Sequence, residues 1–148
     1  MTEFRDMWDA VIADITPQPW DYTSATGTTL TVIPEGSPAA PGDAEVLLII
    51  TADKVLSARV GITTTDLPGL VTALTERRPW DITTLLDGVV TVTYPGSDGV
   101  LLLVTETTWD DERRPSETTV SIRLPEKQRL PLAAALRRTR DVALGWED

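Results

Sequence analysis

A short segment that occurs twice constrains the fold of this chain more than any other feature. Residues 19–23 read Pro-Trp-Asp-Tyr-Thr and residues 79–83 read Pro-Trp-Asp-Ile-Thr, at a spacing of 60 positions (79 − 19). Each segment is followed, in the same order, by a glycine, a Thr-Val pair, a proline, a five-residue apolar run that precedes a threonine, Leu-Pro, Ala-Leu and an arginine. Such self-similarity indicates a duplicated module, with pseudo-repeats at about residues 19–78 and 79–146.

The whole chain, residues 1–148, is expected to form a single domain. Chains of this length bury roughly 70% of their unfolded surface, so two half-domains that cover each other are favoured over two independent ones. A helix over residues 3–15 is predicted ahead of the repeats, because apolar residues recur there at helical spacing. These residues are Phe4, Met7, Trp8, Val11, Ile12 and Ile15.

Alternating or β-branched apolar stretches predict strands in both repeats. The predicted strands cover residues 28–33, 45–52 and 56–63 in the first repeat and residues 82–86, 89–94, 100–107 and 118–124 in the second. The predicted helices run from a cap at Thr65 or Asp66 to residue 78, and over residues 131–144 to a stop at Gly145. Residues 34–43, rich in proline and glycine, are predicted to be an irregular connection.

The fold class predicted by this pattern is α+β. An N-terminal helix precedes a duplicated β-β-β-(β)-α module, whose two antiparallel sheets pack on each other with the helices outside. The apolar runs at residues 46–50 and 100–104 do not alternate, so they predict central strands that are covered on both faces. Four tryptophans are expected in or beside the core. They are Trp8, Trp20, Trp80 and Trp146.

Two short segments accompany this arrangement. They are Thr65-Asp66-Leu67 in the middle of the chain, and Ala135-Leu136-Arg137-Arg138-Thr139 leading to Gly145-Trp146-Glu147 near its end. The tandem four-strand-plus-helix pattern resembles the Whirly and PUR-type domains, which implies binding of single-stranded nucleic acid. With these segments it also resembles the actinobacterial SsgA-like sporulation and cell-division proteins, which implies a Whirly-like fold that acts through protein partners.

Composition excludes several classes of function. The absence of cysteine removes disulfides and thiolate nucleophiles, and the absence of histidine removes the commonest general base and metal ligand. We therefore predict no enzyme, no cofactor and no metal site, although paired carboxylates from different strands stay open as an alternative. The acidic residues 110–112 are interpreted as a solvated hairpin tip rather than a calcium loop.

Localisation is predicted from the lack of a membrane or export signal. The longest apolar runs, of five residues, are far shorter than the ~20 residues of a membrane span. Residues 1–6 lack the basic and apolar regions of a signal peptide. These features predict a cytoplasmic protein without membrane contact.

The two repeats differ most in the length of one connection. Thr51 and Ile62 are 11 positions apart (62 − 51), whereas the equivalent Thr105 and Leu124 are 19 apart (124 − 105), so the second repeat gains eight residues around residues 109–115. Function often resides where loops differ on a fixed scaffold. The candidate partner contacts here are Trp109, Arg113 and Arg114. Trp109 is predicted either to fold back onto the sheet or to stay outside as an anchor.

Charge is distributed unevenly along the chain. The formal net charge is −10, yet residues 113–146 carry eight basic and three acidic residues. The further candidate contacts are Arg137, Arg138 and Arg140 of the last predicted helix. They form either a solvated face, on which Arg137 pairs with Asp141, or a docking patch for an acidic partner such as the N-terminal part of another copy.

The predicted function is a non-enzymatic protein-interaction or regulatory adaptor module that binds a protein partner and can form a homodimer. The first alternative is single-stranded nucleic-acid binding of the Whirly or PUR type. We expect such binding to be weak at best, because the chain is acidic and has only two tyrosines and one phenylalanine for base stacking. The second alternative is a chaperone- or immunity-type binding protein, since those are also small, acidic and α+β.

Overall fold

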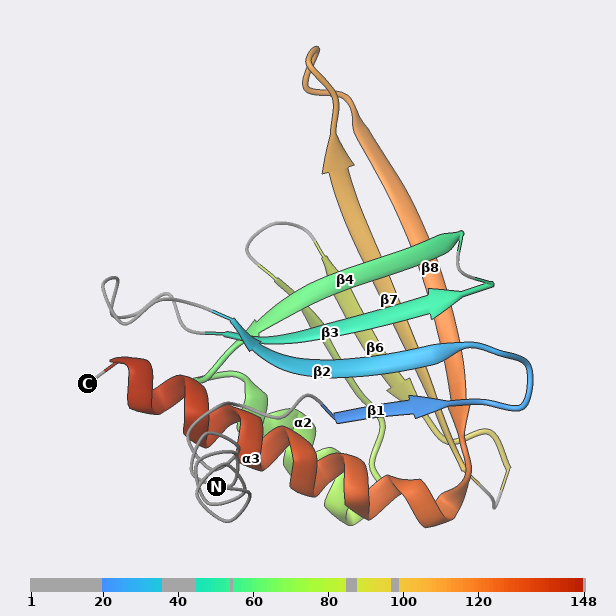
Figure 1. Ribbon diagram of the computed structural model, residues 1–148, viewed down its shortest axis with the longest axis vertical. Helices are drawn as coiled ribbons and strands as arrows, with labels where there is room; N and C mark the ends of the chain where they lie inside the picture. Colours follow the sequence, from blue (N-terminus) through green and yellow to red (C-terminus); the bar gives the residue numbers. More distant parts are fainter. Residues whose placement is uncertain (1–19, 36–44, 54, 85–87, 97–98, 148) are drawn as a thin grey trace, which may run out of the picture.

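The computed structural model describes residues 20–35, 45–53, 55–84, 88–96 and 99–147 (Figure 1). The helix predicted at residues 3–15 lies outside the described residues. So does Trp8.

Each half of the described chain consists of four strands followed by a helix. The first sheet has the order β1-β2-β3-β4 and the second the order β5-β6-β7-β8, with antiparallel neighbours throughout. The strands are β1 (Trp20–Thr23), β2 (Thr29–Glu35), β3 (Glu45–Ala52), β4 (Leu56–Thr63), β5 (Trp80–Thr83), β6 (Val89–Thr93), β7 (Val100–Trp109) and β8 (Pro115–Leu124). The helices are α2 (Leu67–Glu76), the short 3₁₀ helix η1 (Glu126–Gln128) and α3 (Arg129–Glu147). The α+β class and the repeated four-strand module are thus confirmed.

The two sheets have matching strand registers. Trp20 lies opposite Val32 in the first sheet, as Trp80 lies opposite Val92 in the second. A shift of one residue would turn every side chain of a strand to the other face. Equivalent residues of the two repeats therefore take equivalent places in their sheets.

One face of each sheet forms the core. The buried inward residues are Leu30, Val32, Val46, Leu48, Ile50, Ala58, Val60 and Ile62 in the first sheet, and Val90, Val92, Val100, Leu102, Val104, Val120, Ile122 and Leu124 in the second. They belong to one hydrophobic cluster that also includes residues of α2 and α3. In Figure 1 the first sheet lies in front of the second with strands crossing, and β4 contacts both β7 and β8. Trp20 and Trp80 pack half-buried against this cluster.

The outer faces of the two central strands are only partly covered. On β3, Leu47 is buried but Ile49 is half-buried, and on β7 both Leu101 and Leu103 are half-buried. The prediction of two fully covered faces is therefore met at Leu47 and not at the other three positions. Although these runs are apolar throughout, successive side chains point to opposite faces of the sheet, and the outer ones are mostly less buried than the inner ones.

The helices lie together along one side of the sheets (Figure 1). α2 contacts α3, and α3 contacts β2 and β3. Asp66 precedes α2 at the N-cap position without a side-chain capping bond, and Arg77 ends the helix in the left-handed conformation with φ 58°. The helix therefore ends with its cap at Arg77, one residue before the predicted end at residue 78.

Five predicted boundaries need correction. α3 continues through Gly145, because one glycine costs a helix only about 1 kcal/mol and no proline follows it. β2 extends through Pro34. The pairing of β2 with β1 has already ended at Val32, so the missing N–H of Pro34 removes no hydrogen bond to β1. β5 starts two residues earlier than predicted, at Trp80. The β7–β8 pairing also continues past the predicted ends of both strands, to Trp109 opposite Pro115.

Candidate functional site

A two-stranded arm, defined here as residues 106–118, extends the second sheet beyond the rest of the molecule. β6 pairs with β7 only as far as Thr105. Beyond that residue β7 and β8 continue as a pair to Trp109 opposite Pro115. Figure 1 shows the arm projecting away from both sheets and from the helices.

The arm accounts for the eight residues that distinguish the second repeat from the first. In the first sheet Ala52 lies opposite Leu56, and three residues join them. In the second sheet the equivalent pair is Glu106 and Thr118, followed by three further pairs and a five-residue tip, residues 110–114. The sequence placed the difference correctly, but most of the added length is strand and not loop.

The base of the arm is fixed to the first sheet by Glu106. Its Oε1 accepts a hydrogen bond of 3.3 Å from the backbone N–H of Arg59, and its Oε2 lies 3.7 Å from Arg59 Nε. Arg59 lies on β4, the edge strand of the first sheet. Glu106 thus satisfies a donor that a sheet edge otherwise leaves open.

The tip is organised by Asp110. Its Oδ1 accepts the backbone N–H groups of Glu112 at 2.9 Å and Arg114 at 2.8 Å. Its Oδ2 lies 3.3 Å from Arg114 Nε, and Arg114 also pairs with Glu112. Arg113 takes the left-handed conformation with φ 62°, which closes a type I turn with a bulge at its end. The tip therefore has a defined conformation.

The acidic group at the tip serves this turn. The Asp110 carboxylate is engaged by two backbone amides and by Arg114. Among the described residues, no group of three or more aspartates or glutamates is placed to hold a metal ion.

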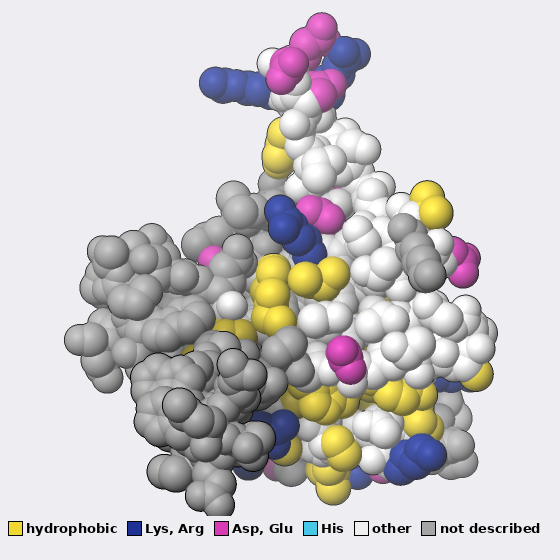
Figure 2. Space-filling view, viewed as in Figure 1, with side chains coloured by type: hydrophobic (Ala, Val, Ile, Leu, Met, Phe, Trp, Pro, Cys, Tyr) yellow, Lys and Arg dark blue, Asp and Glu magenta, His cyan; other side chains and the backbone are white. Residues whose placement is uncertain are grey.

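The two remaining arm candidates, Trp109 and Arg113, are open to solvent. Trp109 is 54% exposed at the last strand pair, so it is not folded back onto the sheet. Arg113 is exposed, and no partner for its side chain is found in the described part of the chain. Figure 2 shows the acidic and basic side chains of the tip gathered at the far end of the arm, beyond a sheet face that carries few charges.

The arginines of the last helix lie apart from the arm. α3 runs along the opposite side of the molecule from the tip in Figure 1. Arg137 and Arg138 are exposed, and the expected ion pair between Arg137 and Asp141 is not formed. Arg140 is half-buried, and its Nε donates a hydrogen bond of 2.7 Å to the carbonyl of Thr64. The six candidate residues therefore form two separate surfaces, with Arg140 tying α3 to the end of β4.

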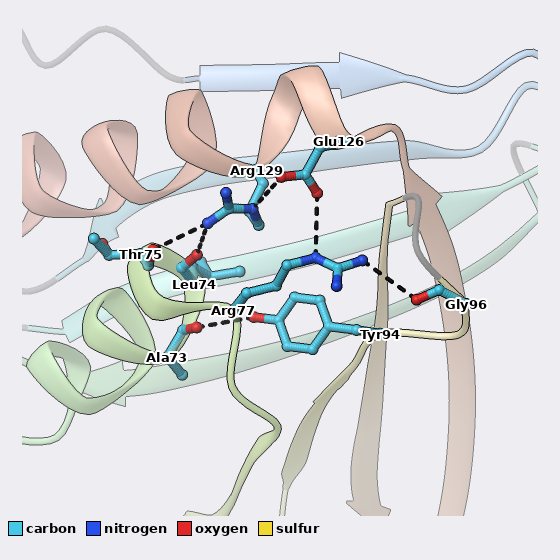
Figure 3. Close-up of polar contacts among 8 residues, drawn as sticks. All are labelled: Ala73, Leu74, Thr75, Arg77, Tyr94, Gly96, Glu126 and Arg129. Carbon is cyan, nitrogen blue, oxygen red and sulfur yellow. Dashed lines mark hydrogen bonds and ion pairs between the residues drawn. The ribbon is translucent and has the colours of Figure 1, made fainter.

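A second polar cluster, which the sequence did not reveal, surrounds the C-terminal end of α2 (Figure 3). We call it the clamp, and it consists of Arg77, Tyr94, Glu126 and Arg129. Arg129 Nη1 donates to the carbonyls of Leu74 and Thr75, and its Nε donates to Glu126 Oε1 at 2.7 Å. The last carbonyls of a helix lack partners within the helix, so Arg129 completes the end of α2.

Arg77 and Tyr94 form the other side of the clamp. The Tyr94 hydroxyl donates a 2.9 Å hydrogen bond to the carbonyl of Ala73, and the Arg77 guanidinium lies 5.2 Å from the centre of the Tyr94 ring. Arg77 Nε lies 3.5 Å from Glu126 Oε2. Burial raises the pKa of the Tyr94 phenol, against the opposing charges of Arg129 and Arg77. The hydrogen bond from Arg129 lowers the pKa of the Glu126 carboxyl.

An open hollow of about 640 Å³ lies where the β1–β2 turn, the β6–β7 loop and the end of β8 meet. Arg123 is the one charged side chain among its described lining residues. The hydroxyls of Ser24 and Thr26 bond to each other at 2.8 Å, and Ser24 Oγ accepts the N–H of Thr28. Because these groups are engaged in the turn, the hollow offers few free groups for a ligand.

No protein-family model matches the chain, and a search of curated proteins finds no match. In the described part of the chain, no helix is both long and apolar enough to cross a membrane.

Proposed function

We propose that the protein is a non-enzymatic interaction module that binds a protein partner through the tip of the β7–β8 arm. The observation that carries the proposal is the arm itself. Trp109 is 54% exposed on a projecting hairpin. Neighbouring residues 108–117 are also exposed, so they contribute nothing to the core.

The chemistry of the tip suits a protein contact. Tryptophan and arginine contribute most to binding energy at protein interfaces, and Trp109, Arg113 and Arg114 lie within six consecutive residues of the sequence. The hydrogen bonds of Asp110 hold the tip in one conformation, which reduces the entropy lost on binding.

The clamp supports a structural role and not catalysis. Its polar groups face the end of α2, and each of the four residues takes part there in a hydrogen bond or an ion pair. The displaced pKa values of Tyr94 and Glu126 arise from burial and from neighbouring arginines in this cluster. Perturbed pKa values can mark an active site, but structural ion-pair networks produce them as well.

The nucleic-acid alternative receives less support from the sheet faces. Single-stranded nucleic acid is bound by aromatic side chains beside a cationic groove. The described outward-facing residues of β3, β4, β7 and β8 between the arm and the sheet ends are mainly threonine, serine and aliphatic residues. Of the two arginines there, Arg59 is paired with Glu106, which leaves Arg123.

The proposal is tested by comparing partner capture by matched variants in a lysate of the source cells. The triple variant W109A/R113A/R114A is expected to lose the captured protein, because it removes the exposed anchor and both cations of the tip. The control K127A, which removes an exposed cation away from the arm, is expected to retain it.

Two further measurements separate the alternatives. Loss of the partner in R137A/R138A, with retention in the tip variant, would assign the contact to α3 and overturn the proposal. A shift of labelled single-stranded DNA at physiological salt that weakens as salt rises would support the nucleic-acid alternative. A chaperone- or immunity-type role would appear as a single captured client or toxin.

A further inference from the structure

β8 is a long edge strand with an open side. It lies at the end of its sheet and pairs only with β7 among the described strands. The bonds of the tip show which of its backbone groups face outward. The N–H of Asp110 donates to the carbonyl of Arg114, and antiparallel pairs alternate between bonded and non-bonded positions. The even-numbered residues of β8 therefore bond to β7, and the odd-numbered residues point their N–H and C=O groups to the open side.

Two features of the strand agree with this assignment. Pro115, which has no N–H, takes one of the odd positions, where no β7 bond is lost. The side chains of Glu117, Thr119, Ser121 and Arg123 are all exposed.

The charges of β8 are arranged symmetrically about its middle. Glu117 and Arg123 are its only charged residues, and Val120 lies midway between them. When two copies of β8 run antiparallel with the two Val120 residues opposite, Glu117 of each copy faces Arg123 of the other. In the same register Thr119 faces Ser121, so each outward N–H and C=O from Glu117 to Arg123 meets a partner.

We propose that two copies of this chain associate through β8, about a twofold axis at Val120, to form one continuous eight-stranded sheet. The occupant of the edge is a second copy because the strand is complementary to itself: opposite charges directly across a strand pair are favourable, and like charges are unfavourable. A twofold contact of this kind uses the same surface on both copies and closes on itself.

Exposed apolar side chains beside the edge support this arrangement. Val55 is 92% exposed and Leu56 is 48% exposed, both at the β3–β4 turn. β3 and β4 contact β8, and their turn lies on the same side of the molecule as the open edge (Figure 1). Because the strands run antiparallel, the two arms project in opposite directions.

Charge reversal with rescue tests the register. Sedimentation velocity of the full chain is expected to show a dimer. E117R and R123E, each of which places like charges across both symmetry-related pairs, are expected to weaken dimerisation at least about tenfold. The double variant E117R/R123E restores opposite charges and is expected to restore the dimer. A double variant no better than either single variant would overturn the proposal.

A backbone variant tests the edge itself. S121P removes an outward N–H without removing a bond to β7, so the fold, followed by circular dichroism, is expected to persist while the dimer is lost. A monomeric wild-type chain at the highest concentration reached, or a dimer that survives S121P, would also overturn the proposal. W109A is expected to remain dimeric, which separates this interface from partner binding by the arm.

Discussion

Arginine and carboxylate side chains meet in two regions of this molecule with opposite consequences. In the clamp, the Arg129 side chain is 14% exposed and donates to two backbone carbonyls as well as to Glu126. At the tip of the arm, the Arg114 side chain is 71% exposed and its carboxylate partners lie in solvent. Exposed ion pairs contribute little to stability, whereas hydrogen bonds from a charged, largely buried side chain to the last carbonyls of a helix are costly to lose. The clamp is therefore expected to stabilise the fold more than the ion pairs of the tip do.

The largest effect is expected from R129M. This change keeps much of the side-chain volume but leaves the carbonyls of Leu74 and Thr75 without the charged donor. The free energy of unfolding is expected to fall by about 2–3 kcal/mol, measured by urea unfolding. The matched variant R114M at the tip is expected to change it by less than about 0.5 kcal/mol. Equal losses in the two variants would remove the distinction between the regions.

A smaller effect is expected from Y94F. The change removes only the hydroxyl that donates to the carbonyl of Ala73, and a neutral hydrogen bond contributes about 1 kcal/mol. Tyr22 provides the control, because no hydrogen bond of its hydroxyl is found among the described residues. Y22F is expected to have the stability of the wild type, and an equal loss in Y22F would show that the hydrogen bond to Ala73 is not responsible for the effect of Y94F.

The dependence of stability on acidic pH provides a further test of the clamp. The pKa of Glu126 is lower in the folded protein, chiefly because Arg129 donates a hydrogen bond to the carboxylate. A lowered folded pKa contributes stability above the ordinary glutamate value of about 4.3, and this stability is lost as pH falls through the folded pKa. E126Q is expected to flatten the loss of stability in that range, measured as the urea midpoint against pH. A profile for E126Q parallel to that of the wild type would contradict the clamp.

The smallest effect on stability is expected from removing the end of the arm. Replacing residues 107–117 with Asp-Lys-Val, the sequence that joins Ala52 to Leu56 in the first sheet, keeps Glu106 and its bond to Arg59. The free energy of unfolding is expected to change by no more than about 1 kcal/mol, while partner capture is lost. A variant that fails to fold would show that the arm belongs to the core.

Most strands that border the core were predictable from the sequence, although β1 was not predicted. The ends of β3 and β4 match the predicted ranges 45–52 and 56–63, because apolar and polar residues change there at turn-forming residues. The matching register of the two sheets follows from the duplicated Pro-Trp-Asp segment. In these regions, local pattern and tertiary packing favour the same structure.

The strands of the arm were only partly predictable. Residues 106–109 are Glu-Thr-Thr-Trp, and the tip carries five charged residues in a row, which is typical of a loop. These residues become strand because the inner part of β7–β8 fixes the register and the pairing continues outward from it. A pattern based on core burial cannot detect strands that have no core to face.

The clamp and the Arg140 contact could not be predicted, because each joins an arginine to the end of a helix or strand that is far away in the sequence. Arg129 meets Leu74, a residue 55 positions away, and Arg140 meets Thr64, a residue 76 positions away. Sequence analysis placed both arginines in one basic concentration. Which arginine remains free depends on which helix and strand ends lie within its reach.

The placement of Glu106 at the base of the arm bears on polymerisation. A strand from another molecule that approaches the edge of β4 meets the Glu106 carboxylate, which already accepts the N–H of Arg59. The other edge strands, β1 and β5, have only four residues each. The ten-residue β8 is thus the longest edge strand with an unpaired side among the described strands. If the β8 edges of two copies pair with each other, no exposed strand edge of comparable length remains among the described strands, and growth towards fibrils stops at two molecules.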